Sequence, residues 1–102
     1  MTENKYNLSG KNVLICGGLG WLGSHYSKGI LNSSDAIFIL DNDDLDAYKD
    51  FFTEKELEKI VYQKVDFYNH EKFKTTLRKI IKDNHINCLI NNAFDFSSNT
   101  GF

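Results

Sequence analysis

Arginine is almost absent from this sequence, and positive charge is not in excess. Of the 12 basic residues only Arg78 is an arginine, and the 14 acidic residues leave a formal net charge of −2. A protein that binds DNA or RNA neutralises the phosphate backbone with clustered lysine and arginine side chains. Nucleic acid is therefore not an expected partner.

Cysteines and long hydrophobic runs are also scarce. Cys16 and Cys88 are far apart in the sequence and form no Cys-x-x-Cys pair of the kind that binds metals or carries redox chemistry. The longest apolar run covers only residues 36–40, whereas a membrane-spanning helix needs about 20 apolar residues. Residues 1–7 are polar and lack the apolar core of a signal peptide. We therefore expect a cytoplasmic protein with no membrane partner.

The sequence does contain a regular alternation of apolar runs and amphipathic segments. Hydrophobic residues make up 41% of the chain and charged residues 25%, as in an ordinary globular domain. Four short apolar runs, each followed by glycine, asparagine or aspartate, predict buried strands. These runs are residues 12–16, 36–40, 60–65 and 88–90. Apolar residues at helical spacing predict helices over residues 20–32, within 41–58 and over 69–84.

This order of elements predicts the topology. Strands that alternate with helices pair in parallel through right-handed crossovers, so we predict an α/β fold with a doubly wound sheet in the order 3-2-1-4. The fourth strand, residues 88–91, is then an edge with no outer neighbour, which predicts self-association into a homo-oligomer. Cys16 and Cys88 would lie on adjacent strands but about three residues out of register, near 10 Å apart and too far for a disulfide.

A glycine-rich segment, residues 17–23, follows the first predicted strand and opens the first helix. Gly17 permits a sharp turn, Gly20 lets a pyrophosphate approach backbone N–H groups, and Gly23 lets the helix lie close to the sheet. Asp41 ends the next strand, where a carboxylate accepts hydrogen bonds from an adenosine ribose. The pattern predicts a Rossmann-like, incomplete dinucleotide-binding sheet of about four strands. A structural turn in some other α/β protein is the alternative.

The carboxylates after the second and third predicted strands suggest how the dinucleotide is held. A 2′-phosphate would meet Asp41, Asp43 and Asp44 with no arginine nearby, so NAD is preferred over NADP. Asp66 is a candidate acceptor for the adenine amino group. Alternatively, Asp41 only caps the following helix and Asp66 only forms a turn.

Further motifs extend this pattern along the chain. Residues 8–11 lead into the glycine loop, Asp66 ends the third strand, and the sequence Asn91-Asn92-Ala93 follows the fourth. From about residue 8 to 94 the chain thereby resembles the short-chain dehydrogenases/reductases. In that family the Asn-Asn-Ala turn steadies the sheet and borders the adenosine half of the cofactor, which implies that Asn91 and Ala93 line the cleft. The alternative is a simple turn after a strand.

The resulting candidate site is for a cofactor and includes no catalytic residue and no metal ligand. We expect Trp21 to pack under the glycine loop rather than to stack on a ligand. The three histidines are scattered, with no metal-ligand spacing. The candidate cofactor-binding residues are Gly17, Gly20, Trp21, Leu22, Gly23, Asp41, Asn42, Asp66, Phe67, Asn91, Asn92 and Ala93.

The resemblance implies an NAD-dependent oxidoreductase that interconverts a carbonyl and an alcohol, acting on an unidentified small-molecule substrate. Family members carry a catalytic serine and a Tyr-x-x-x-Lys pair well beyond the Asn-Asn-Ala turn. We therefore expect residues 1–102 to be the single N-terminal half of a dinucleotide-binding domain, truncated and inactive alone, with a polar tail over about 95–102. The pair Tyr68 and Lys72 precedes the fourth strand, at the adenine end, and is not assigned to catalysis.

The subfamily stays open. The Gly-x-x-Gly-x-x-Gly spacing resembles the family's sugar-nucleotide branch, whereas Asn-Asn-Ala resembles its shorter oxidoreductase branch. A sugar or nucleotide-sugar substrate, or a fragment of a nucleotide-sugar epimerase or dehydratase, is therefore an alternative. A non-catalytic dinucleotide-binding or sensing module is the alternative from another functional class.

Overall fold

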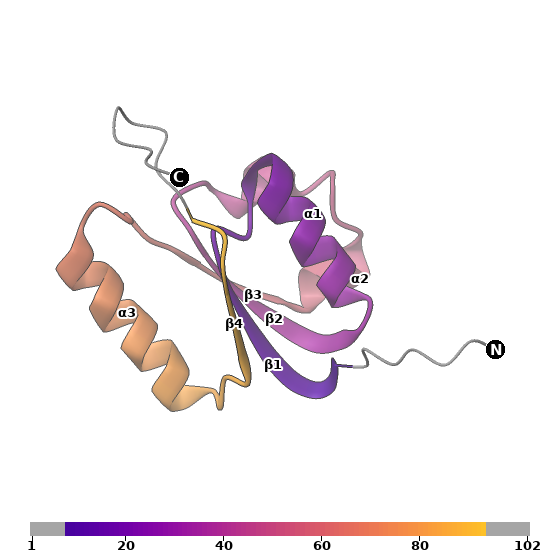
Figure 1. The fold of residues 1–102 in the computed structure, drawn as a ribbon. Helices are drawn as coiled ribbons and strands as arrows, with labels where there is room; N and C mark the ends of the chain where they lie inside the picture. Colours follow the sequence, from indigo (N-terminus) through magenta and orange to yellow (C-terminus); the bar gives the residue numbers. More distant parts are fainter. Residues whose placement is uncertain (1–7, 94–102) are drawn as a thin grey trace.

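A computed structural model describes residues 8–93 as one parallel sheet with helices on both faces (Figure 1). The predicted polar tail over about 95–102 lies outside the described residues. The sheet order is β3-β2-β1-β4 and every pair is parallel, so the predicted doubly wound topology is confirmed. The strands are β1 (Leu8–Cys16), β2 (Ser34–Asp41), β3 (Ile60–Lys64) and β4 (Cys88–Asn91). The helical elements are α1 (Gly20–Leu31), η1 (Leu45–Tyr48), α2 (Glu54–Glu58) and α3 (His70–Asp83).

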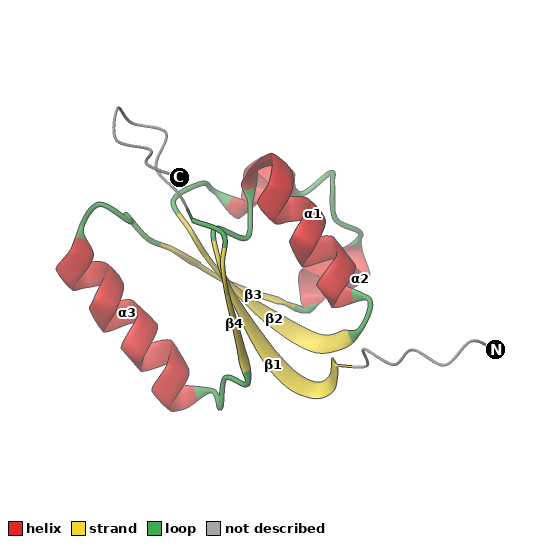
Figure 2. Ribbon diagram, in the orientation of Figure 1, coloured by secondary structure: helices red, strands yellow, loops and turns green. Residues whose placement is uncertain are grey.

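The two faces of the sheet have separate hydrophobic cores. Figure 2 shows α1 and α2 on one face and α3 on the other. Alternate residues of β1 and β2 point to opposite faces, so both strands are apolar at successive positions. The core on the α1 side includes Val13, Ile15, Leu31, Ile37, Ile39 and Phe52. The core on the α3 side includes Leu14, Cys16, Phe38, Leu40 and Val65, with Phe73, Leu77 and Ile80 of α3 packed against it.

The connection between β2 and β3 differs from the prediction of one amphipathic helix within residues 41–58. It consists of η1 and the separate, short α2. Phe52, between them, turns into the core and is only 4% exposed. Thr53 then starts α2 with a capping box: its hydroxyl accepts from the Glu56 N–H, and the Glu56 carboxylate accepts from the Thr53 N–H. This new helix start interrupts the helical path, which the spacing of apolar residues alone did not reveal.

The first strand begins earlier than predicted, at Leu8. Its pairing with β2 is irregular between Leu8 and Asn12, where Gly10 adopts a φ of +75° and its N–H donates to the Asp35 carboxylate at 2.8 Å. A positive φ of this size favours glycine. This irregularity lies at the amino end of β1, at the opposite end from the glycine loop.

The two cysteines are free and occupy different surroundings. Cys88 lies opposite Val13, and Cys16 lies opposite Asn91, so the predicted three-residue offset is confirmed. Burial raises the pKa of the Cys16 thiol to about 11, which keeps it protonated and unreactive at neutral pH. Cys88 is exposed on β4, which has no outer neighbour within residues 8–93. Over the same residues, no helix has the length and apolarity needed to span a membrane.

Candidate functional site

A cleft of about 1010 Å³ opens at the carboxyl ends of the parallel strands. In open α/β sheets, ligands bind beyond the carboxyl ends of the strands, at the point where the chain connections on the two sides run in opposite directions. In this sheet that point is the carboxyl end of β1, which lies between β2 and β4. The volume is at the upper end of the usual range for small-molecule sites, about 300–1,000 Å³. The lining residues are Gly17, Leu19, Gly20, Trp21, Leu22, Gly23, Asp41, Asn42, Asp43, Phe67, Tyr68, His70, Asn92 and Ala93.

The three glycines of the predicted motif have three different surroundings. Gly17 has a φ of +79°, and a Cβ there would come within 2.7 Å of the Ala93 backbone nitrogen. A Cβ on Gly23 would collide with the Gly17 carbonyl oxygen, so Gly23 lets α1 pack against the loop. Gly20 has a φ of +80°, but a Cβ there would meet no atom within 4 Å. Gly20 therefore presents bare backbone to open space at the cleft.

The start of α1 lies at the same place. The first four N–H groups of a helix have no acceptor within the helix and carry its positive dipole end. The N-cap residue Leu19 provides no side-chain cap, and the first turn contains no acidic residue. The start of α1 thus has backbone donors available to an anion in the cleft.

Asp41 joins the end of β2 to the glycine loop. Asp41 is only 5% exposed. One carboxylate oxygen accepts from the Leu19 N–H at 2.9 Å, and the other accepts from the Asp43 N–H at 2.9 Å. A carboxylate has about four acceptor positions, so two remain for a ligand. Asp41 caps no helix, because the N-cap of the following η1 is Asp44.

The Asn-Asn-Ala turn fastens β4 to the glycine loop from the other side. The Asn92 backbone N–H donates to the Cys16 carbonyl at 2.8 Å, and its side-chain amide donates to the Gly17 carbonyl at 3.1 Å. The Asn91 side chain accepts from the Ala93 N–H at 3.3 Å and thus holds the turn itself. Asn92 and Ala93 line the cleft, whereas Asn91 does not.

Comparison with known proteins agrees with this geometry. No family model matches the chain. Alcohol dehydrogenase 1 of Ceratitis capitata is 37% identical over 90 residues, which are 85% of this chain and 35% of that protein. This chain resembles the N-terminal portion of a short-chain dehydrogenase/reductase. The crystal structure of Cj0485 dehydrogenase shares the fold, with a TM-score of 0.67 and 20% identity over 89% of this chain and 34% of that one. The chain thus spans about one third of the length of both.

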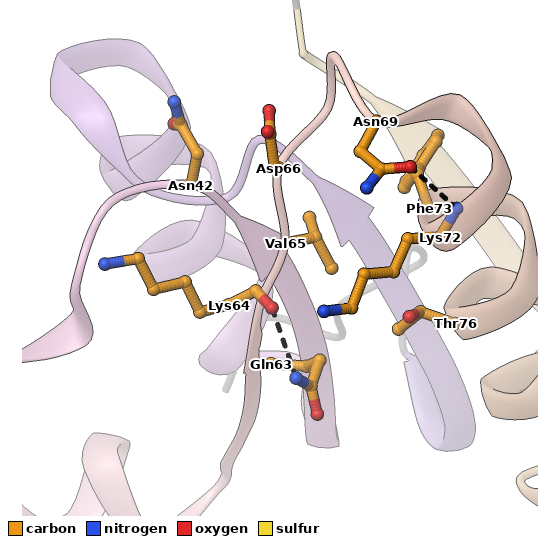
Figure 3. A pocket seen from close by; sticks show the side chains of 9 residues that line it. All are labelled: Asn42, Gln63, Lys64, Val65, Asp66, Asn69, Lys72, Phe73 and Thr76. Atoms are coloured by element: carbon orange, nitrogen blue, oxygen red, sulfur yellow. Dashed lines mark hydrogen bonds between the residues drawn. The ribbon is translucent and has the colours of Figure 1, made fainter.

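Asp66 lies away from the main cleft. It borders a second cavity of about 550 Å³ between the end of β3 and α3, shown in Figure 3. Asn42 lines both cavities and is therefore the link between them. One oxygen of the Asp66 carboxylate accepts from the Tyr68 N–H at 2.9 Å, so Asp66 also forms the local turn.

The positions of two aromatic residues, Trp21 and Tyr68, test predictions made from the sequence. The expectation that Trp21 packs under the loop is wrong, because its side chain is 81% exposed and lines the cleft. Its ring contacts that of His25, one helical turn further on, with centroids 5.4 Å apart. Tyr68 lines the main cleft and Lys72 the second cavity, so this Tyr-x-x-x-Lys pair does not face one common site.

Three residues that line the cleft, Leu19, Tyr68 and His70, were not among the predicted ones. Asp43 also lines the cleft, and the sequence predicted it only as a carboxylate that a 2′-phosphate would meet. A Cβ on Gly18 would come within 2.9 Å of the Ile39 side chain, so this glycine packs the loop onto β2. The overlapping Gly-x-Gly-x-x-Gly spacing of residues 18–23 was the available signal for Gly18. The positions of Tyr68 and His70 depend on the path of the connection between β3 and α3, for which the sequence has no comparable motif.

Proposed function

We propose that this chain binds a nicotinamide dinucleotide, with NAD preferred over NADP, and supplies the cofactor-binding part of an oxidoreductase. The observation that carries the proposal is the bare backbone of Gly20 in the cleft, beside the uncapped start of α1 and the Asp41 carboxylate. A pyrophosphate needs both close approach to backbone and N–H donors. The open space at Gly20 allows the approach, and the uncapped first turn of α1 supplies the donors.

The residues present fit the two polar parts of such a cofactor. The N–H groups in the first turn of α1 would bind the pyrophosphate, and Asp41 would accept from the adenosine ribose hydroxyls with its two remaining acceptor positions. Asn42 and Phe67 would border the adenosine half, and Leu22, Asn92 and Ala93 the rest of the cleft. When bound, the nicotinamide ring would donate or accept a hydride.

We also propose an activity. By analogy with the dehydrogenases that this chain resembles, the oxidoreductase would interconvert an alcohol and a carbonyl, with a sugar or nucleotide-sugar among the candidate substrates. Residues 1–102 would form one half of the dinucleotide-binding domain and would not transfer hydride alone. We further propose a cytoplasmic location and a homo-oligomeric state.

Calorimetric titration of the chain with NAD tests this proposal through Gly20→Ala. The added methyl group would stand where the pyrophosphate must approach, so we expect NAD affinity to fall about tenfold or more. Gly10→Ala is the matched control, because Gly10 also has a positive φ and open space around it but lies at the other end of β1. Its NAD affinity should equal that of the wild type. Unchanged NAD binding by Gly20→Ala, or no binding by the wild type, would refute the proposal.

A further inference from the structure

Trp21 leaves a large aromatic ring in contact with solvent at the cleft. It is the only tryptophan of the sequence, it is 81% exposed, and it lines the cleft. Aromatic side chains provide large contact areas on binding, and their flat faces suit planar or apolar parts of a ligand. The Trp21 ring therefore offers contact area that the described residues leave uncovered.

A row of further rings supports Trp21 from behind. The Trp21 and His25 rings have centroids 5.4 Å apart, and the His25 and Phe51 rings have centroids 5.0 Å apart. Phe51 meets the ring of Phe52 edge-on at 5.2 Å, and Phe52 is buried in the core on the α1 side. The four rings thus form a continuous row from the cleft to the hydrophobic core.

Polar contacts hold the two middle rings of this row. The Nδ1 atom of His25 lies 2.6 Å from the Trp21 carbonyl oxygen, and because that oxygen can only accept, Nδ1 donates. The Lys28 amine donates to the Phe51 carbonyl at 3.0 Å and lies 5.2 Å from the centre of the Phe51 ring. A side chain that is held in place before a ligand arrives loses little conformational freedom on binding. The row thus preorganises Trp21.

The same row places Trp21 on the β2 side of the glycine loop. Phe51 belongs to the connection between β2 and β3, which begins after Asp41 at the end of β2. On the other side, Asn92 and Ala93 border the loop from the end of β4. Trp21 is therefore on the side of the cleft that contains Asp41.

The segment after β2, which lines this side of the cleft, is also held by other elements. The Tyr48 hydroxyl, from η1, donates to the Asp43 carboxylate at 3.0 Å. The Tyr62 hydroxyl, from β3, donates to the Asp43 backbone carbonyl. The Asp43 N–H donates to the Asp41 carboxylate at 2.9 Å. Both Trp21 and this segment are therefore in place before a ligand binds.

We propose that Trp21 is an aromatic wall against which the adenosine half of a dinucleotide packs, and that His25 is the positioning residue for Trp21. This inference rests on the proposed function, in which the pyrophosphate lies at the start of α1 and the adenosine ribose at Asp41. A dinucleotide in that orientation extends its adenosine half along the β2 side, where Trp21 lies. Contact between an aromatic side chain and a nucleobase stabilises binding without any hydrogen bond to the base.

Calorimetry with NAD and with ADP-ribose, which lacks the nicotinamide ring, tests the aromatic wall. Trp21→Ala should weaken the binding of both ligands about tenfold, and Trp21→Phe, which keeps a ring, about threefold or less. Tyr26→Ala is the matched control, because Tyr26 is also an exposed aromatic residue of α1 but does not line the cleft. Its dissociation constants should equal those of the wild type.

A double-mutant cycle tests the role of His25. His25→Ala removes the ring that supports Trp21 and should weaken NAD binding about threefold. In the Trp21→Ala background the same change should have no further effect, because His25 acts only through Trp21. Iodide should quench the Trp21 fluorescence less strongly when NAD is bound, since the ligand then covers the ring.

Wild-type affinity in Trp21→Ala, an equal loss in Tyr26→Ala, or a loss with NAD but not with ADP-ribose would overturn the aromatic wall. NAD binding that depends on Gly20 would still uphold the proposed function in each of these cases. Equal effects of His25→Ala with and without Trp21 would overturn the positioning role of His25. If the wild type binds neither ligand, the proposed function fails and this inference fails with it.

Discussion

Leu14 on β1 and Leu89 on β4 are directly paired across the sheet, yet their surroundings are opposite. Leu14 is 0% exposed, whereas Leu89 is 51% exposed. Both are leucines on the same face, the face that α3 covers, because paired residues of neighbouring strands point to the same side. The difference arises because β1 has a strand on each side, while β4 has β1 on one side only within the described residues.

This comparison shows that an apolar strand is not buried by its own composition. The four residues of β1 that pair with β4 are buried throughout, whereas no residue of β4 is fully buried. The central strands are therefore where apolar burial stabilises the fold. The exposed backbone edge and apolar side chain of β4 are instead available for contact with another polypeptide.

The largest expected effect follows from truncating the two paired leucines. Leu14→Ala should destabilise the chain by about 3 kcal/mol, because it leaves a cavity in a closed core, and Leu89→Ala by less than about 1 kcal/mol. Urea unfolding, monitored by circular dichroism, measures both. Equal losses of unfolding free energy would show that β4 is as well covered as β1 in solution.

A smaller effect is expected on self-association through the β4 edge. We expect the wild-type chain to associate at high micromolar concentration and Leu89→Lys to weaken that association about tenfold, because a lysine on an edge strand opposes pairing. Val61→Lys is the matched control, since Val61 is also 51% exposed but lies on the opposite edge strand, β3. Sedimentation velocity measures the association. A monomeric wild type, or equal effects of both lysines, would contradict a role for β4.

The central sheet was predictable because its signals are local. Four apolar runs, each closed by a turn residue, and the glycine loop after the first run specified the strand order, including the offset of Cys16 and Cys88. The two short helices between β2 and β3 were not predicted, because the spacing of the apolar residues favours one helix. The Thr53-x-x-Glu56 pattern of a capping box was the available sign of a second helix start.

The candidate site was predictable to a similar extent. Its glycines and Asp41 belong to one short motif with fixed spacing, so they were found from the sequence. The contacts of Tyr48 and Tyr62 with Asp43 depend on how η1 and β3 come together in space, and no spacing in the sequence encodes them. The exposure of Trp21 likewise depends on the direction of a side chain at the start of α1.

The smallest expected effect concerns a polar contact between α1 and α2, which lie on the same face of the sheet. The Lys28 amine bonds to the Glu56 carboxylate at 2.6 Å and so links α1 to α2. This hydrogen bond, and then the one from the Thr53 N–H, lower the pKa of Glu56, so its contribution to stability is present at neutral pH and lost as pH falls through the lowered pKa.

Glu56→Gln should therefore lower the free energy of unfolding by about 0.5–1 kcal/mol at pH 7. This difference from the wild type should disappear in acid, once Glu56 is protonated in the folded state. Glu54→Gln, on the same helix but outside the ion pairs of residues 8–93, should change stability less at pH 7. Urea unfolding of both variants from pH 7 to pH 3 measures this. A Glu56→Gln cost that persists unchanged in acid would show that the negative charge of Glu56 does not stabilise the contact between α1 and α2.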